Sequence, residues 1–186
     1  MAKLYFRFGA MNCSKTANAL MVKFNYEENG QTVFLIKPAT DTRDDEVVSR
    51  IGLRSPVKLV GPKEDIYDIV FQGGPVHCVI VDEAQFLNKE QVHQLTDLVD
   101  KLNVPVICYG LRSDFQGNLF PGSEALLALA DTIEEIKTIC WCGKKATMNM
   151  RIEDGKAVFQ GEQVHIGGNE SYVAVCRKHW KEGRIK

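Results

Sequence analysis

Residues 9–16 have the types and the spacing of a phosphate-binding loop. They follow the apolar run of residues 4–8, which predicts a buried strand, and lead into residues 16–22, which predict a helix. In this arrangement backbone N–H groups surround a polyphosphate, the Lys15 ammonium reaches the β and γ phosphates, and the Thr16 hydroxyl holds Mg²⁺. The candidate nucleotide-binding residues are Gly9, Ala10, Met11, Asn12, Cys13, Ser14, Lys15 and Thr16.

Ser14 departs from the pattern G-x-x-x-x-G-K-[ST]. The pattern places glycine directly before the lysine, because a residue without Cβ lets the backbone approach the phosphate closely. Serine is the next smallest polar residue, and we expect it to be tolerated with weaker nucleotide affinity. The alternative is a surface turn that happens to contain Lys15 and Thr16, so a second motif must decide.

The second motif is a pair of acids at the end of an apolar run. Residues 76–81 predict a buried strand, and its first two following residues are Asp82 and Glu83. In phosphate-loop proteins the first acid after such a strand holds Mg²⁺. The alternative, two acids that only cap a strand end, is disfavoured by the phosphate loop upstream. The candidate nucleotide-binding set therefore also includes Asp82, Glu83, Ala84 and Gln85.

The charged segment of residues 38–49 contains a further pair of candidates. Its default interpretation is a solvated loop. It follows a predicted strand at residues 32–37, however, and would leave a parallel sheet at the carboxyl edge, where open α/β sheets bind ligands. Asp41 and Arg43 are therefore candidates to face the phosphates.

Apolar residues also occur in a long loop, residues 110–122, which contains glycine and proline. Leu111, Phe115 and Phe120 lie in this loop. Such side chains either tuck under the loop or line a flat apolar ligand pocket. From the residue types alone we favour the tucked arrangement.

Four metal-binding side chains gather near the end of the chain. Two pairs with short internal spacing are separated by a long segment, and together they predict a closed, structural Cys₃His zinc site. Isolated core thiols are the alternative interpretation. Cys13, Cys78 and Cys108 occur singly, where cysteine behaves as a small hydrophobic residue. The candidate metal ligands are Cys140, Cys142, Cys176 and His179.

The order of the predicted elements indicates an α/β fold. Strands and helices alternate through residues 1–138, which predicts a P-loop NTPase-type, mostly parallel sheet with helices on both faces. We expect residues 132–139 to form one strand. Residues 139–186 would form a small second domain stapled by zinc, with a hairpin at Asp154 and Gly155.

Composition narrows the function classes. The chain has 186 residues, 45% of them hydrophobic and 25% charged, as expected for a soluble globular protein. The net charge of −1 argues against a nucleic-acid partner and against an anionic membrane. We find neither a signal-peptide pattern nor an apolar stretch of membrane-spanning length. A cytoplasmic protein is therefore predicted.

In combination these motifs resemble the zinc-containing thymidine kinases of the cellular type, in particular their bacterial branch. The resemblance covers nearly the whole chain. It rests on the phosphate loop with Met11, the run that begins at Asp82, residues 111–120, the two cysteine and histidine pairs, and residues 166–172 ending at Tyr172. It implies a P-loop α/β domain, a zinc domain with a lasso loop over the nucleoside, and usually a homotetramer.

The resemblance also implies residue roles. Glu83 would take the proton from the thymidine 5′-hydroxyl. Lys15, Thr16 and Asp82 would hold ATP·Mg²⁺, with Asp41 and Arg43 near the phosphates. The lasso backbone, between Gly143 and Tyr172, would hydrogen-bond the base, and thymidine triphosphate would act as a feedback inhibitor. The positions expected around the nucleoside are Met11, Phe86, Leu111, Phe115, Phe120 and Tyr172.

Two features of this chain depart from that family. Ser14 replaces a glycine, which affects the expected ATP affinity, and Cys140 and Cys142 are closer in sequence than the family's usual pair. Two other functions remain open. One is a non-catalytic nucleotide sensor. The other is a DNA-dependent ATPase, which the short chain and its near-zero net charge disfavour.

Overall fold

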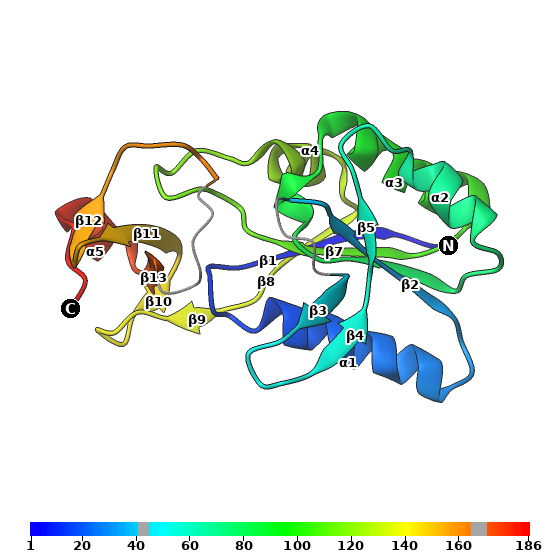
Figure 1. Cartoon of the computed structure of the whole chain (residues 1–186), viewed down its shortest axis with the longest axis horizontal. Coiled ribbons are helices and arrows are strands. Elements are labelled where there is room, and N and C mark those ends of the chain that lie inside the picture. Colours follow the sequence, from blue (N-terminus) through cyan, green and yellow to red (C-terminus); the bar gives the residue numbers. More distant parts are fainter. Residues whose placement is uncertain (41–44, 165–170) are drawn as a thin grey trace.

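The computed structural model describes residues 1–40, 45–164 and 171–186 and is built around a six-stranded sheet (Figure 1). The strand order is β5-β2-β6-β7-β1-β8, and each neighbouring pair is parallel. The predicted α/β class is therefore confirmed. The strands are β1 (Leu4–Phe8), β2 (Val33–Pro38), β5 (Lys58–Val60), β6 (Cys78–Val81), β7 (Val106–Gly110) and β8 (Thr132–Glu135).

Helices cover both faces of this sheet. Helix α1 (Lys15–Glu28) lies on one face, and α3 (Lys89–Leu102) and α4 (Pro121–Leu129) lie on the other, with α2 (Ile66–Gln72) against α3 (Figure 1). None of the helices in the described part of the chain has both the length and the apolarity to cross a bilayer.

The alternation of side chains along the strands produces two apolar cores. In β6, Val79 and Val81 point toward the α3 face, whereas Cys78 and Ile80 point toward α1. All four are fully buried, which explains why this strand is a continuous apolar run in the sequence. Burying each such side chain contributes roughly 1.5–3 kcal/mol.

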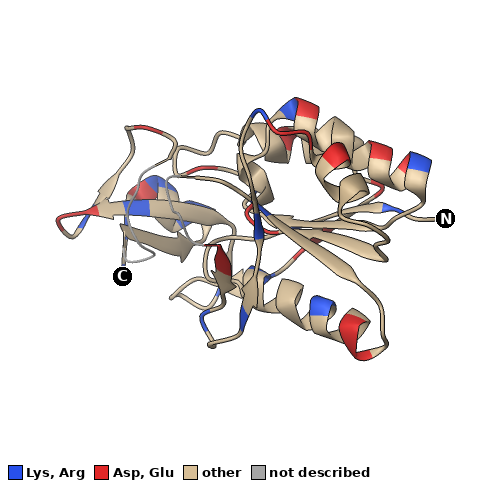
Figure 2. Ribbon diagram, turned by 45° about the vertical axis from the view of Figure 1, so that its right-hand side comes forward, with Lys and Arg blue, Asp and Glu red and all other residues tan. Residues whose placement is uncertain are grey.

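Helix α3 has the predicted start signal. Asn88 and Gln91 form a capping box, because each side chain hydrogen-bonds the other residue's backbone N–H. Val92, Leu95 and Leu98 are buried against the sheet. Basic and acidic residues are interspersed on the outer side of the helices that cover this face (Figure 2).

A second region lies beyond one end of the sheet (Figure 1). It has a small apolar core of its own that includes Met148, Met150 and Val175. The predicted hairpin is present between β11 and β12, with Asp154 and Gly155 at positive φ. Its elements are β9 (Thr138–Ile139), β10 (Lys145–Ala146), β11 (Met148–Glu153), β12 (Lys156–Val158), β13 (Tyr172–Val175) and α5 (Arg177–Glu182).

Two predictions about local structure are wrong. Residues 132–139 do not form one strand: β8 pairs with β1 in the central sheet, whereas β9 pairs with β10. The run is divided because β9 pairs antiparallel with β10 across the turn that contains Cys140, and so leaves the central sheet. Residues 38–49 are not wholly a loop either, since β3 (Glu46–Val48) pairs with β4 (Arg54–Pro56) in a hairpin.

Candidate active site and metal centre

The phosphate-binding loop connects β1 to α1 with a constrained backbone. A Cβ on Gly9 would collide with Cys13 Sγ and the Ile136 carbonyl oxygen, so glycine is required there. Asn12 and Ser14 have φ values of 64° and 66°, in the left-handed region. Asparagine tolerates that conformation, but serine is strained in it, at the position where the loop pattern has glycine.

The Lys15 side chain folds over this loop. Its Nζ donates hydrogen bonds to the carbonyl oxygens of Ala10, at 2.9 Å, and Gly9, at 3.3 Å. Cys13 Sγ lies 3.4 Å from the same nitrogen. The ammonium is therefore held against the loop, and Lys15 lines the cavity that the loop borders, where it could meet a bound anion.

Thr16 and Asp82 meet beneath the loop. The Thr16 hydroxyl donates a 2.9 Å hydrogen bond to Asp82 Oδ2. Asp82 is only 4% exposed. Burial, together with the charge of Glu83, raises the Asp82 pKa to about 6, although the Thr16 hydrogen bond lowers it. A carboxylate and a hydroxyl are oxygen donors of the kind that Mg²⁺ takes, so the pair fits that ion.

Glu83 is held in place by Gln85. The Glu83 backbone has φ 53°, an uncommon conformation for a non-glycine residue that often marks functional sites. The Gln85 amide nitrogen donates to the Glu83 carboxylate, and its oxygen accepts the Leu111 N–H at 3.2 Å. A Cβ on Gly110 would lie 2.7 Å from that oxygen, so a glycine beside it keeps the space open.

A cavity of about 840 Å³ connects these groups to an apolar wall. Phe86 and Phe120 are in edge-to-face contact, with ring centroids 5.7 Å apart. Leu111, Phe115 and Phe120 are largely buried and also line the cavity. Both arrangements considered in the sequence analysis are therefore present, because these side chains tuck under their loop and also form part of a pocket. The predicted residues that line it are Met11, Asn12, Cys13, Ser14, Lys15, Thr16, Glu83, Gln85, Phe86, Leu111, Phe115, Phe120 and Tyr172.

Some predicted residues have other positions. Gly9, Ala10, Asp82 and Ala84 are not in the cavity lining: Gly9 and Ala10 supply the carbonyls that Lys15 binds, and Ala84 is fully buried. Asp41 and Arg43 lie outside the described residues.

Further residues line the cavity that the sequence did not single out. The rule that ligands bind at the carboxyl edge of a parallel sheet points to those at the end of β2. No local sequence signal marks Asn149, which lies on β11 and accepts the Met11 N–H at 2.8 Å. The additional lining residues are Ala17, Lys37, Ala39, Thr40, Val48, Arg50, Ile51, Ser113, Asp114, Asn149, Gln163 and Val164.

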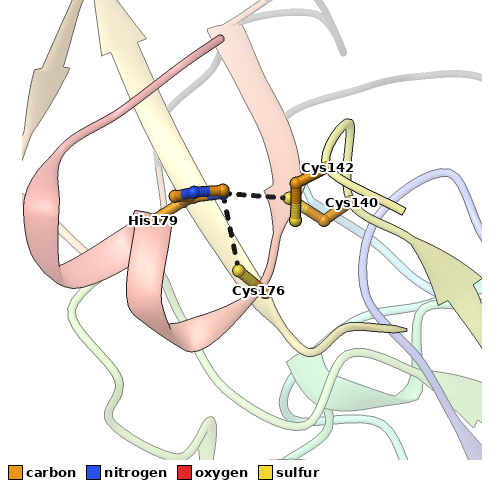
Figure 3. A group of neighbouring side chains, drawn as sticks. All are labelled: Cys140, Cys142, Cys176 and His179. Atoms are coloured by element: carbon orange, nitrogen blue, oxygen red, sulfur yellow. Dashed lines mark hydrogen bonds between the residues drawn. The ribbon is translucent and has the colours of Figure 1, made fainter. Parts of the chain in front are cut away.

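The four candidate metal ligands come together as predicted. The ligand atoms of Cys140, Cys142, Cys176 and His179 all lie within 4.8 Å of one another. His179 Nδ1 is 3.5 Å from Cys140 Sγ and 3.5 Å from Cys176 Sγ (Figure 3). Ordinary zinc bond lengths at a tetrahedral angle give a nitrogen to sulfur separation of about 3.5 Å. The donor set and its spacing therefore fit zinc.

The surroundings of this cluster act differently on two of its thiols. A backbone hydrogen bond from Lys144 lowers the pKa of Cys142, but burial and the hydrogen bonds with Cys140 and Cys176 outweigh it and raise that pKa. Burial raises the pKa of the Cys140 thiol, but hydrogen bonds from the Cys142 backbone and from His179 outweigh it and bring that pKa down to about 6. The thiolate is the form that binds zinc. The Trp141 ring stacks on the His179 ring with centroids 4.3 Å apart, which fixes the plane of the imidazole.

Comparison with known proteins identifies the family. Residues 2–180 match the family model described as Thymidine kinase. The chain belongs to the thymidine kinase family. The resemblance drawn from the motifs is thus confirmed.

Curated relatives match over nearly their whole length. The chain is 52% identical to the Thymidine kinase of Legionella pneumophila (strain Lens), over 98% of this chain and 91% of the relative. It is 51% identical to the Thymidine kinase of Streptococcus thermophilus (strain CNRZ 1066), over 97% and 94%. With the Thymidine kinase of Ruegeria pomeroyi it shares 50% identity, over 98% and 95%. The family match thus includes the part of the chain that contains the four candidate metal ligands, the last of which is His179.

Proposed function

We propose that this chain is a thymidine kinase that transfers the γ-phosphoryl group of ATP to the 5′-hydroxyl of thymidine, which gives thymidine monophosphate for DNA synthesis by salvage. One observation carries the proposal beyond family membership. The Thr16–Asp82 pair lies beneath the phosphate loop, and Glu83, the next residue, lines a cavity that is also lined by apolar side chains. The phosphates of the donor and the nucleoside that accepts the phosphoryl group could therefore bind next to each other in one cavity.

On the donor side, the N–H groups of residues 9–14 and the Lys15 ammonium would hold the phosphates of ATP. Thr16 and Asp82 would hold Mg²⁺, which when bound neutralises charge on the β and γ oxygens. By family resemblance, Asp41 and Arg43 would also lie near the phosphates. Ala84 and Gln85 would complete the site, Gln85 by fixing the carboxylate of Glu83.

On the acceptor side, Glu83 would accept the proton of the 5′-hydroxyl. Its carboxylate lines the cavity one residue beyond the magnesium-binding acid, so it lies near both the acceptor oxygen and the γ-phosphoryl group. Positioning and charge neutralisation supply most of the catalysis in such transfers. The nucleoside would be surrounded by Met11, Phe86, Leu111, Phe115, Phe120 and Tyr172.

The proposal also assigns a role to each of the two domains that the sequence predicts. Residues 1–138 would form the ATP-binding domain, and residues 139–186 a zinc domain whose lasso covers the nucleoside. The separate apolar core around Met148 and Met150 supports this boundary. Zinc bound by Cys140, Cys142, Cys176 and His179 would be structural, because four protein ligands leave no position for water.

The remaining features of the proposal concern assembly and regulation. We expect a cytoplasmic homotetramer without a nucleic-acid partner. Thymidine triphosphate would inhibit it by occupying the acceptor pocket and extending its phosphates toward the donor site. Size-exclusion chromatography with light scattering tests the tetramer, and inhibition that is competitive with thymidine tests the regulator.

The deciding experiment measures ADP and thymidine monophosphate formed from ATP, Mg²⁺ and thymidine by zinc-loaded protein. Reactions with deoxycytidine and without nucleoside are the controls. Thymidine-dependent formation of both products supports the proposal. Folded protein that binds ATP but forms no monophosphate would refute it and point to a nucleotide sensor. Stimulation of ATP hydrolysis by single-stranded DNA would point to a DNA-dependent ATPase instead.

A further inference from the structure

Arg151 is a buried cation beside the cavity. The residue is only 2% exposed, and its partners among the described residues are neutral groups. It lies in β11, the central strand of the three-stranded sheet β12-β11-β13. Its backbone is therefore fixed by a paired strand on each side, with Tyr172 of β13 and Val158 of β12 directly opposite.

Three separate segments meet on its guanidinium group. The guanidinium carbon lies 3.7 Å from the centroid of the Phe115 ring, in the loop after β7. Nε and Nη2 donate to the Tyr172 hydroxyl at 3.0 Å and 2.8 Å. Nη2 also donates to the Glu162 carbonyl oxygen at 2.8 Å and the Gln163 carbonyl oxygen at 3.5 Å. Phe115, Gln163 and Tyr172 all line the cavity.

Two further contacts hold the segment around Glu162 against this point. A Cβ on Gly161, whose φ is 145°, would lie 3.0 Å from Arg151 Nη1, so a glycine lets the backbone approach the guanidinium. The Gln163 side chain donates to Asp114 Oδ2 at 3.0 Å. The segment is thus attached both to β11 and to the loop that contains Phe115.

We propose that Arg151 is a positioning residue for the thymidine side of the cavity: its guanidinium fixes Phe115, Tyr172 and the Glu162–Gln163 backbone relative to one another. This inference rests on the proposed function. The role needs arginine rather than any cation, because only the planar fork can stack on a ring and donate in two directions at once. A lysine at this position keeps the charge and loses the geometry.

The first test is Arg151→Lys in the zinc-loaded, full-length protein. We expect the KM for thymidine to rise about tenfold or more, while the KM for ATP stays within about twofold, because the donor-side residues do not touch Arg151. The matched control is Arg184→Lys, which makes the same change at an exposed arginine of the same region that also lies over an aromatic ring, at 5.6 Å from Trp141. That variant should leave both KM values unchanged.

A second measurement does not depend on activity. Glu162 is exposed and its carbonyl is held by Arg151, so a glutamate-specific protease should cleave after Glu162 about tenfold faster in Arg151→Lys than in wild type. Cleavage after the exposed Glu153, at the end of β11, is the internal reference and should not change. Protease accessibility reports the attachment itself, so it separates this inference from the kinase proposal.

Tyr172→Phe gives an independent route if Arg151→Lys fails to fold. It removes the hydroxyl that accepts from Nε and Nη2 and keeps the ring. It should raise the thymidine KM and speed cleavage after Glu162, as Arg151→Lys does. Where Arg151→Lys folds, the two substitutions together should be less than additive.

Two results would overturn the inference. One is an unchanged thymidine KM together with unchanged cleavage after Glu162. The other is an equal rise of both KM values, with faster cleavage after Glu153 as well, which would mean that Arg151 only stabilises the fold. If wild type itself forms no thymidine monophosphate, the proposed function fails, whereas selective cleavage after Glu162 in Arg151→Lys would still show that Arg151 fixes this wall of the cavity.

Discussion

Thr16 and Asp82 lie 66 positions apart in the sequence, yet the Thr16 hydroxyl donates a 2.9 Å hydrogen bond to the Asp82 carboxylate. The pairing order of the sheet does not put β1 and β6 side by side, since β7 lies between them. Helix α1 closes the gap, because it begins at the carboxyl edge of β1 and packs across the face of β6. This contact is the most direct structural sign of a nucleotide site.

Asp82→Asn should stabilise the magnesium-free protein at high pH. Burial and the charge of Glu83 raise the Asp82 pKa from 3.8 to about 6, so the folded state binds its proton more tightly than the unfolded state does. The ionised carboxylate therefore destabilises the fold above about pH 6, by at most about 3 kcal/mol, and this cost fades as the pH falls toward 4.

Urea unfolding at pH 8 and pH 5 measures this difference. The variant should exceed wild type in free energy of unfolding at pH 8, and the gap should shrink at pH 5. A gap that is the same at both pH values would contradict the pKa shift. The same variant should lose most of its magnesium-dependent turnover.

Glu83→Gln should greatly slow phosphoryl transfer and spare ATP binding. The amide keeps the size of the carboxylate but cannot accept the hydroxyl proton, so kcat should fall by about 10² to 10⁴. Thymidine monophosphate formation and ATP binding by calorimetry measure the two effects. Full activity in this variant would remove Glu83 from the chemistry.

Ser14→Gly should stabilise the protein and tighten ATP binding. Ser14 has φ 66° and its side chain makes no capping hydrogen bond to α1, so glycine relieves strain and loses no contact there. We expect up to about 1 kcal/mol of added stability and a lower KM for ATP.

Ser14→Ala is the matched control, since it keeps the Cβ and the strain. It should show neither gain. A Ser14→Gly variant that is less stable than wild type would mean that the serine side chain contributes something beyond its backbone conformation.

His179→Ala should lose zinc and destabilise residues 139–186. Removing one of four closely spaced ligands leaves three thiols and an open fourth position, so zinc is held more weakly, and structural zinc supplies much of the folding energy of such small regions. Zinc content and thermal unfolding measure the loss, which should be several kcal/mol. The control is His93→Ala on α3, whose side chain is exposed and which should change stability by less than about 0.5 kcal/mol.

The groups that we propose to bind phosphate and metal were predictable from the sequence. A phosphate loop needs Lys15 and Thr16 at fixed offsets between a strand and a helix, and the acid pair needs only the end of a buried strand. The candidate metal ligands were also found, because Cys140 with Cys142 and Cys176 with His179 are two closely spaced pairs of zinc-binding side chains. Local spacing carries all of this information.

Other features were decided by packing between distant segments. Asn149 contacts Met11, and Arg151 contacts Phe115, only because β11 lies beside the loops that follow β1 and β7. Nothing in the periodicity of residues 132–139 revealed that they divide between two sheets. The sequence by itself therefore identified the candidate phosphate and zinc ligands, which follow short-range rules, and through family resemblance part of the cavity lining. Tertiary structure alone decided that Asn149 and Arg151 lie beside this cavity, because long-range contacts place those side chains.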